Sequence, residues 1–261
     1  MPRIRVISEV HEENTENPVG KVQLGPAISV VGGGVALALA HVVSPLSPLG
    51  WTVGLAYLVA SNALVGAGLR RRRAVRFGWG NDATATRSVL VGVISALVAT
   101  SFTTSISVPL LIGLAAPALA LDAVDGWLAR RTGTTSELGA RFDMEVDAFL
   151  LLALSIYVAR SLGWWVLAIG LLRYAFVAAG WLLPWMRATL PPRYWRKVVT
   201  AVAGIALTIA ASGLAPSWMG AGIAGVALAL LVESFGRDVV WLWRSRRSAG
   251  SRMPRRAWAR P

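Results

Sequence analysis

The sequence predicts an all-α polytopic membrane protein with about eight transmembrane helices. Of its 261 residues, 55% are hydrophobic and only 15% are charged, and the mean hydropathy is +0.58. Several apolar runs approach or exceed the roughly 20 residues that cross about 30 Å of hydrocarbon. Basic residues gather in alternate connections between these runs, as they do in membrane proteins of fixed orientation.

The apolar runs define the predicted helices in order. They lie at 25–44, 50–69, 88–107, 108–128, 144–160, 163–184, 198–213 and 218–242. The first two hold no ionisable side chain except His41, so we expect an accessory pair ahead of a six-helix core. The connections at 44–50 and 212–220 contain proline and glycine but no charge, which predicts turns on the poorly charged side of the membrane.

The basic connections set the expected orientation. They lie at 70–87, 130–141 and 187–197 and in the tail from 244, whereas the opposite connections contain only Arg160. We therefore expect these connections and both termini to face the cytoplasm, with the protein in the cell (plasma) membrane.

Five regions follow from this pattern. We expect a cytoplasmic tail at 1–24, two accessory transmembrane helices at 25–69 and a basic amphipathic segment in the headgroup plane at 70–87. The six-helix core then spans 88–243, and the basic tail at 244–261 is attracted to anionic lipid.

Composition also excludes several classes of site. The formal net charge is +13, but the arginines lie between apolar runs, which favours lipid headgroups over nucleic acid. The chain has no cysteine, so it contains neither a disulfide framework nor a thiolate metal site. Its two histidines, His11 and His41, are too few to build a metal site alone.

Four aspartates lie at the expected cytoplasmic ends of two consecutive helices. Asp122 and Asp125 share one face of the first helix, and Asp143 and Asp147 share one face of the next. Carboxylates brought together in a partly dehydrated site repel one another unless cations neutralise them. Two hard divalent ions, Mg²⁺ or Mn²⁺, suit four acidic groups; a paired structural charge network is the alternative.

Small and basic residues accompany the aspartates. Gly126, Ala129 and Gly139 leave room for a bulky ligand to approach the backbone. Arg130 supplies a guanidinium suited to a diphosphate. The combination suggests a nucleotide or diphosphate substrate.

These residues form the pattern D-x-x-D-G-x-x-A-R-x(8)-G-x-x-x-D-x-x-x-D from Asp122 to Asp147, which resembles the signature of the CDP-alcohol phosphatidyltransferases. A second stretch, Asn81, Thr84 and Arg87, resembles the N-x-x-T-x-x-R that commonly precedes the first core helix of that family. The resemblance covers about 81–243 and leaves the first two helices outside it.

The resemblance implies transfer of a phosphoalcohol, usually phosphatidyl, from a CDP-linked lipid to an acceptor hydroxyl, with release of CMP. It implies that Asp122, Asp125 and Asp143 bind metal and that Asp147 both contacts a metal and accepts the acceptor's proton. The family pattern further implies a homodimer. Residues that would bind the cytidine diphosphate portion are Asp122, Gly126, Ala129, Arg130 and Gly139.

The acceptor site is less clearly marked. Arg173 lies within an apolar helix, where it would bind an acceptor phosphate or pair with Glu233. Arg196 and Lys197 begin the next helix, and Lys197 with Thr200 resembles family members that use glycerol phosphate; ordinary anchoring by basic residues is the alternative.

Acidic residues complete the candidate set. Glu233 would hydrogen-bond acceptor hydroxyls or form a structural pair, and Glu145 is expected to orient its neighbours. Arg237 and Asp238 fit side chains that snorkel to the interface. Our first prediction for the acceptor is glycerol 3-phosphate, followed by inositol phosphate, inositol or serine.

Two other functional classes share part of this pattern. An aspartate-rich, Mg²⁺-dependent membrane prenyltransferase usually has two separated acidic motifs, whereas these acids occupy one helix-loop-helix. A transporter or divalent-ion binding protein would place ionisable groups near the bilayer midplane in repeated halves. Here the acids cluster at one end of the helices, which favours the transferase.

Overall fold

The computed structural model describes residues 18–72, 79–132, 137–188, 190–191 and 193–250, with side chains for 29–67, 85–122, 142–188, 190–191 and 193–246. These residues form eight α-helices and two short 3-10 turns, and no strand occurs among them, which confirms the predicted all-α class. The helices are α1 (Pro18–Val43), α2 (Pro48–Arg72), α3 (Trp79–Thr100), α4 (Val108–Thr132), α5 (Glu137–Leu162), α6 (Leu167–Leu182), α7 (Tyr194–Ser212) and α8 (Ser217–Gly250).

Each predicted apolar run coincides with a helix, but the helices are often longer. Helix α5 begins at Glu137 rather than near 144, and α8 continues to Gly250. The run at 163–184 is divided into η1 (Trp164–Val166), α6 and η2 (Pro184–Arg187). Leu183 is extended (φ −117°, ψ 96°) because a residue before proline is disfavoured in the helical region, and α6 ends there.

The predicted interfacial segment at 70–87 is helical at both ends. Helix α2 runs to Arg72 and α3 begins at Trp79, so Arg87 lies inside α3. Residues 73–78 lie outside the described part of the chain, as do 1–17 and 251–261 of the two predicted tails.

Two serines begin helices on the poorly charged side. The Ser47 hydroxyl accepts a hydrogen bond from the Gly50 N–H at 3.1 Å, and Pro48 occupies the first position of α2. The Ser107 hydroxyl accepts the Leu110 N–H at 3.4 Å at the start of α4. At the same side α7 ends on Gly213, whose φ of 68° lies in the left-handed region that glycine favours.

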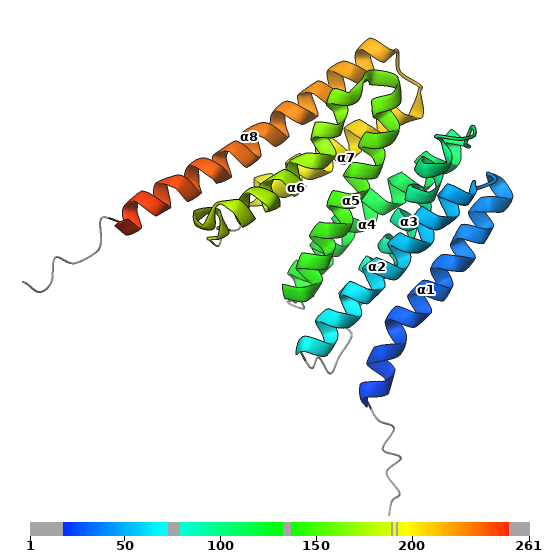
Figure 1. The fold of residues 1–261 in the computed structure, drawn as a ribbon, viewed down its shortest axis with the longest axis horizontal. Helices are drawn as coiled ribbons and strands as arrows, with labels where there is room; N and C mark the ends of the chain where they lie inside the picture. Colours follow the sequence, from blue (N-terminus) through cyan, green and yellow to red (C-terminus); the bar gives the residue numbers. More distant parts are fainter. Residues whose placement is uncertain (1–17, 73–78, 133–136, 189, 192, 251–261) are drawn as a thin grey trace, which may run out of the picture.

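Helix α3 forms the centre of the fold. Residues 91–98 are all buried, because α1, α2, α4 and α5 pack around this helix. Figure 1 shows α1 and α2 side by side on one flank, while α8 extends from the opposite flank. The accessory pair therefore packs directly on the core.

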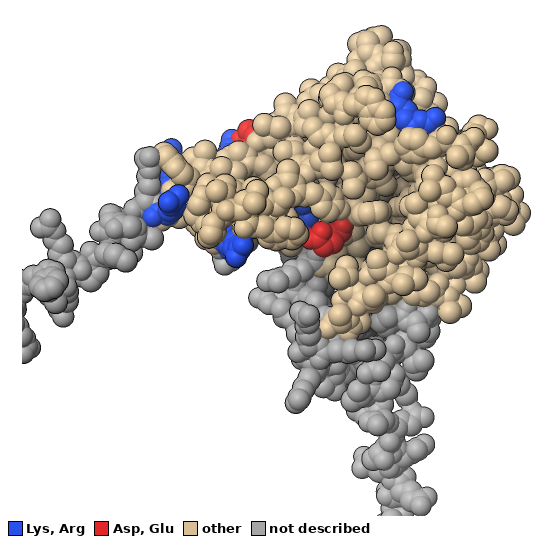
Figure 2. All heavy atoms as spheres, in the orientation of Figure 1, with Lys and Arg blue, Asp and Glu red and all other residues tan. Residues whose placement is uncertain are grey.

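Within the described part of the chain, four helical segments are long and apolar enough to cross a membrane, which indicates a membrane protein. They are Pro48–Ala67, Trp164–Leu182, Tyr194–Ser212 and Ser217–Arg246. Shorter apolar stretches of 10–17 residues lie in α1, α3 and α4. Figure 2 shows that the described surface on one face carries few charged side chains, as expected for contact with lipid.

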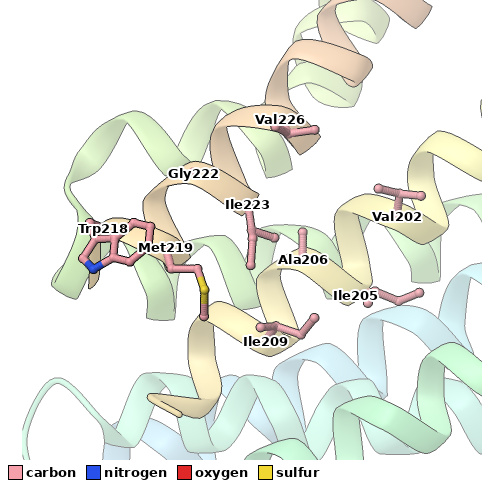
Figure 3. Close-up of a pocket in the computed structure, with 9 residues that line it drawn as sticks. All are labelled: Val202, Ile205, Ala206, Ile209, Trp218, Met219, Gly222, Ile223 and Val226. Carbon is pink, nitrogen blue, oxygen red and sulfur yellow. The ribbon is translucent and has the colours of Figure 1, made fainter. Parts of the chain in front are cut away.

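An apolar groove of about 450 Å³ lies between α7 and α8. Ile205 and Ile209 of α7 face Met219 and Ile223 of α8 across it (Figure 3). Since both helices are candidate membrane spans, hydrocarbon is the natural neighbour of this surface.

Candidate active site

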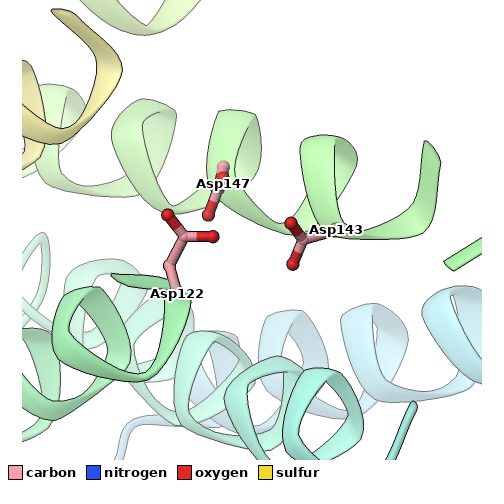
Figure 4. A group of neighbouring side chains, drawn as sticks. All are labelled: Asp122, Asp143 and Asp147. Carbon is pink, nitrogen blue, oxygen red and sulfur yellow. The ribbon is translucent and has the colours of Figure 1, made fainter. Parts of the chain in front are cut away.

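Three aspartates from two helices converge on one point. Asp122 comes from α4, and Asp143 and Asp147 come from successive turns of α5, where a spacing of four residues places both on one face. One oxygen atom from each carboxylate lies within 4.8 Å of the others. Figure 4 shows the three side chains pointing toward one another across the gap between the helices.

The guanidinium of Arg87 lies among these carboxylates. Its Nη1 donates to Oδ1 of Asp122 at 2.8 Å, and its Nη2 lies 3.2 Å from Oδ1 of Asp147. Nη2 also bonds Oδ1 of Asp143 and donates to that residue's backbone carbonyl at 3.2 Å. The Arg87 side chain has no exposed surface.

The position of Arg87 follows from the packing of α2 against α3. The next residue, Ser88, is buried, and its hydroxyl donates to the Ser61 hydroxyl at 3.3 Å. Tyr57, one turn earlier in α2, lies close to both Arg87 and Ser88. Two residues of the accessory pair therefore contact the start of the core helix that carries the arginine.

The family pattern includes Arg87, but the sequence alone assigns no role to this residue. The available signal was physical: an arginine at the start of an apolar helix needs a counter-ion or access to water. The structure supplies the counter-ions, which are 35 residues away in Asp122 and 56 residues away in Asp143.

The donor set suits a hard divalent cation. Three carboxylates meet one guanidinium, so the cluster retains an excess of negative charge when all are ionised. The carboxylate side chains keep 33%, 25% and 21% of their surface accessible, in the order Asp122, Asp143 and Asp147, so a ligand can reach them. Oxygen ligands of this kind are those that Mg²⁺ and Mn²⁺ prefer.

Residues 80–233, more than half of the chain, match the CDP-alcohol phosphatidyltransferase family. The chain belongs to this family. The searches of curated proteins and of solved structures gave no match. Membership of the CDP-alcohol phosphatidyltransferases makes the chain a phosphotransferase that transfers a phosphoalcohol group from a CDP-alcohol, and the family generally depends on a divalent metal.

The family match also bears on the alternatives. It favours the CDP-alcohol phosphatidyltransferases over a prenyltransferase or a transporter. The matched residues cover α3 to α7 and the first part of α8. Helices α1 and α2 precede it, as predicted.

Several residues of the family pattern have no described side chain. Asp125, Gly126, Ala129 and Arg130 lie in the last turns of α4, and Gly139 lies in the first turn of α5. Their side chains lie outside the described residues, so their roles in metal and nucleotide binding stay predictions.

Arg173 does not pair with Glu233. It forms an ion pair with Glu145, which lies between Asp143 and Asp147 in sequence on α5. Glu145 is half exposed and Arg173 is 28% exposed. The orienting role expected for Glu145 therefore has a specific partner on α6.

Glu233 is engaged elsewhere. It forms an ion pair with Arg237 one turn later in α8, and its Oε2 accepts the indole N–H of Trp195 at 3.0 Å. The expectation that Asp238 snorkels to the interface is wrong, because its side chain is only 4% exposed and lies 3.4 Å from Arg196 and 3.9 Å from Arg193.

Lys197 is a candidate acceptor residue whose positive charge acts on the aspartate cluster. It is close enough to interact electrostatically with both Asp143 and Asp147. Its neighbour Arg196 instead bonds Asp238 and the Pro191 carbonyl. Successive residues at the start of α7 therefore have different partners.

Proposed function

We propose that this enzyme transfers a phosphatidyl group from a CDP-linked lipid, such as CDP-diacylglycerol, to the hydroxyl of a small polar acceptor and releases CMP. The observation that carries the proposal is the convergence of Asp122, Asp143 and Asp147 at the positions of the family pattern. Asp122 ends the apolar stretch Val108–Asp122 of α4, and a polar cluster next to an apolar stretch suits a substrate with a polar nucleotide and two acyl chains.

In this proposal Asp122, Asp125, Asp143 and Asp147 hold two Mg²⁺ or Mn²⁺ ions. When bound, the ions would offset negative charge on the diphosphate and on the departing CMP. Asp122 of α4 and Asp143 of α5 lie close together, which supports a shared site.

Asp147 is the proposed general base. As the acceptor oxygen attacks the β-phosphorus, its proton passes to the Asp147 carboxylate and the bond between phosphorus and the CMP oxygen breaks. Support comes from burial: Asp147 is the least exposed of the three acids, yet it keeps 21% of its surface accessible to a substrate.

The nucleotide portion of the donor is assigned to a neighbouring stretch. Asp122, Gly126, Ala129, Arg130 and Gly139 would bind the cytidine diphosphate. Four of the five lie in α4 and Gly139 lies in α5, and all five fall within the family match.

For the acceptor, we favour a phosphorylated alcohol. Lys197 adds positive charge beside the proposed base, and Arg173 is held by Glu145 on the same helix as that base. Arg196 and Glu233 are weaker candidates because their ion-pair partners, Asp238 and Arg237, lie on α8 and not on the helix of the proposed base. Glycerol 3-phosphate is the first choice, followed by inositol phosphate, inositol and serine.

The setting of the reaction is also part of the proposal. The basic connections support a site that faces the cytoplasm from the cell membrane, where CDP and a water-soluble acceptor reach it and the acyl chains stay in lipid. Membership of the family supports a homodimer by analogy.

The decisive experiment measures CMP release by the purified full-length protein. The assay contains Mg²⁺, CDP-diacylglycerol and one of glycerol 3-phosphate, inositol phosphate, inositol or serine. We expect CMP and the matching phospholipid with one acceptor. Absence of CMP with every acceptor, from a folded and metal-loaded protein, would contradict the proposed donor.

A further inference from the structure

Among the described residues, Arg87 has three acidic partners, and its side chain has no exposed surface. A single guanidinium joins side chains from α3, α4 and α5, because Nη1 bonds Asp122 while Nη2 reaches Asp143 and Asp147. Its complete burial distinguishes it from an arginine that extends along the surface to reach water. The charge is fixed at the point where the three helices meet.

The way in which Arg87 engages the carboxylates is selective. It approaches Oδ1 of Asp122, Oδ1 of Asp143 and Oδ1 of Asp147. The second oxygen of each carboxylate takes part in none of these ion pairs. A carboxylate held by one oxygen keeps its other oxygen for another ligand, as in metal sites whose ligands are oriented by outer hydrogen bonds.

Electrostatics explains why such a residue is needed. Three carboxylates within 4.8 Å of one another repel, and the repulsion would drive α4 and α5 apart before any cation arrives. One guanidinium offsets part of this charge and leaves the remainder to attract a cation. Arg87 can therefore assemble the cluster without saturating it.

The structure also shows a cost that the ion pairs must offset. The Arg87 Nε atom is buried and has no hydrogen-bond partner among the described residues. An unsatisfied buried donor destabilises the fold. Because the side chain is nevertheless fully buried, its terminal nitrogens and their three acids must hold it there.

We propose that Arg87 is a positioning residue that gathers Asp122, Asp143 and Asp147 by one oxygen each and presents their other oxygens to a divalent ion. This inference rests on the proposed function, since it assumes that these acids bind metal. It assigns Arg87 no contact with substrate.

The test compares Mn²⁺ binding by the full-length wild type, Arg87→Met and Arg87→Lys in detergent, with and without CDP. Mn²⁺ bound to protein is measured by the loss of the free-ion signal in electron paramagnetic resonance. Thermal unfolding in EDTA is measured in parallel. Arg160→Met is the matched control. Arg160 lies in the last turn of α5, at the opposite end from Asp143 and Asp147, and its guanidinium bonds the Ser101 hydroxyl.

We expect Arg87→Met to bind Mn²⁺ about 10- to 100-fold more weakly than the wild type, which is the usual effect of losing an outer partner of a metal ligand. Its unfolding temperature in EDTA should also fall. Arg87→Lys keeps the positive charge but loses the planar guanidinium with its several N–H donors. Its Mn²⁺ affinity should therefore lie between those of the wild type and Arg87→Met. Arg160→Met should bind Mn²⁺ as the wild type does.

Other outcomes overturn the inference. Tighter Mn²⁺ binding by Arg87→Met would mean that Arg87 competes with the ion, and unchanged binding would mean that it has no effect on the ligands. If Arg87→Met does not fold, Arg87→Lys decides between the same results. If the wild type and all variants fail to bind Mn²⁺, the proposed metal function fails as well, which distinguishes that failure from an error about Arg87 alone.

Discussion

Tyr57 of α2 stacks on Phe149 of α5, with ring centroids 4.6 Å apart and ring planes inclined by 30°. Phe149 is two residues beyond Asp147, and Tyr57 also lies beside Ser88 and Arg87 on α3. One aromatic side chain from outside the family match thus touches both helices that position the proposed base.

Replacing Tyr57 tests this contact. Tyr57→Ala should lower the unfolding temperature and reduce kcat for CMP release, because it removes a stacked pair worth about 0.5–1.5 kcal/mol and loosens α5. Tyr57→Phe keeps the ring and should retain most of both properties. Equal activity of the alanine and phenylalanine variants would show that the stack does not support the site.

Asp147→Asn should abolish most of the turnover. The amide has nearly the same shape but cannot accept the acceptor's proton, and loss of a general base reduces kcat by about 10²- to 10⁴-fold. Single-turnover measurement of CMP release gives the effect on the chemical step. Near-native turnover by this variant would rule out Asp147 as the base, provided that its unfolding temperature is unchanged.

The Mg²⁺ requirement should depend on the three aspartates of the cluster and not on other acidic residues of α5. EDTA should stop CMP release, and added Mg²⁺ should restore it. Asp143→Asn should need a higher Mg²⁺ concentration for half-maximal rate, because it removes a ligand charge. Glu145→Gln is the matched control on α5: it removes the ion pair with Arg173 and should leave the Mg²⁺ requirement unchanged. A shift as large in Glu145→Gln as in Asp143→Asn would contradict the assignment of ligands.

Neighbouring basic residues at the start of α7 should differ in their effects. Lys197→Gln should raise KM for a phosphorylated acceptor by about tenfold or more, since a hydrogen bond to a charged group contributes about 1.5–3 kcal/mol. Arg196→Gln should chiefly lower the unfolding temperature, because the buried Asp238 loses its nearer partner. An unchanged KM in Lys197→Gln would remove it from the acceptor site.

The close approach of α5 and α6 gives a stability prediction. A Cβ atom added at Gly170 would lie 2.5 Å from the Cα of Leu152, whereas one added at Gly180 in the same helix would meet nothing within 4 Å. Gly170→Ala should therefore lower the unfolding temperature by forcing the helices apart. Gly180→Ala should be neutral or stabilising, because alanine is the better helix former. Thermal unfolding in detergent compares the two, and a loss of equal size in both would contradict the proposed packing.

Local sequence spacing was sufficient to predict the helices and the convergence of three of the four aspartates, Asp122, Asp143 and Asp147. Asp143 and Asp147 are separated by one helical turn, and the short connection to α4 brings Asp122 beside them, so their convergence follows from periodicity. The apolar runs likewise predicted helices, because a helix is one of the few structures in which a chain in lipid can form all its backbone hydrogen bonds.

Long-range partners could not be predicted in the same way. Arg87 meets acids 35 and 56 residues away, and Arg173 meets Glu145 at a separation of 28 residues rather than Glu233. Asp238 was expected at the interface but is buried against Arg193, which precedes α7, and Arg196, in its first turn. Each of these pairs depends on how helices pack, which no local pattern encodes.

Leu58 of α2 is wholly buried, and its methyl groups fill the space beside Gly33 of α1 and Gly92 of α3. A chimera that transplanted only the segment shared with the family would carry Gly92 without the side chain that occupies its socket. The packing of the core therefore extends beyond the segment that matches the family. Any minimal version designed for reconstitution must begin upstream, with the first hairpin included.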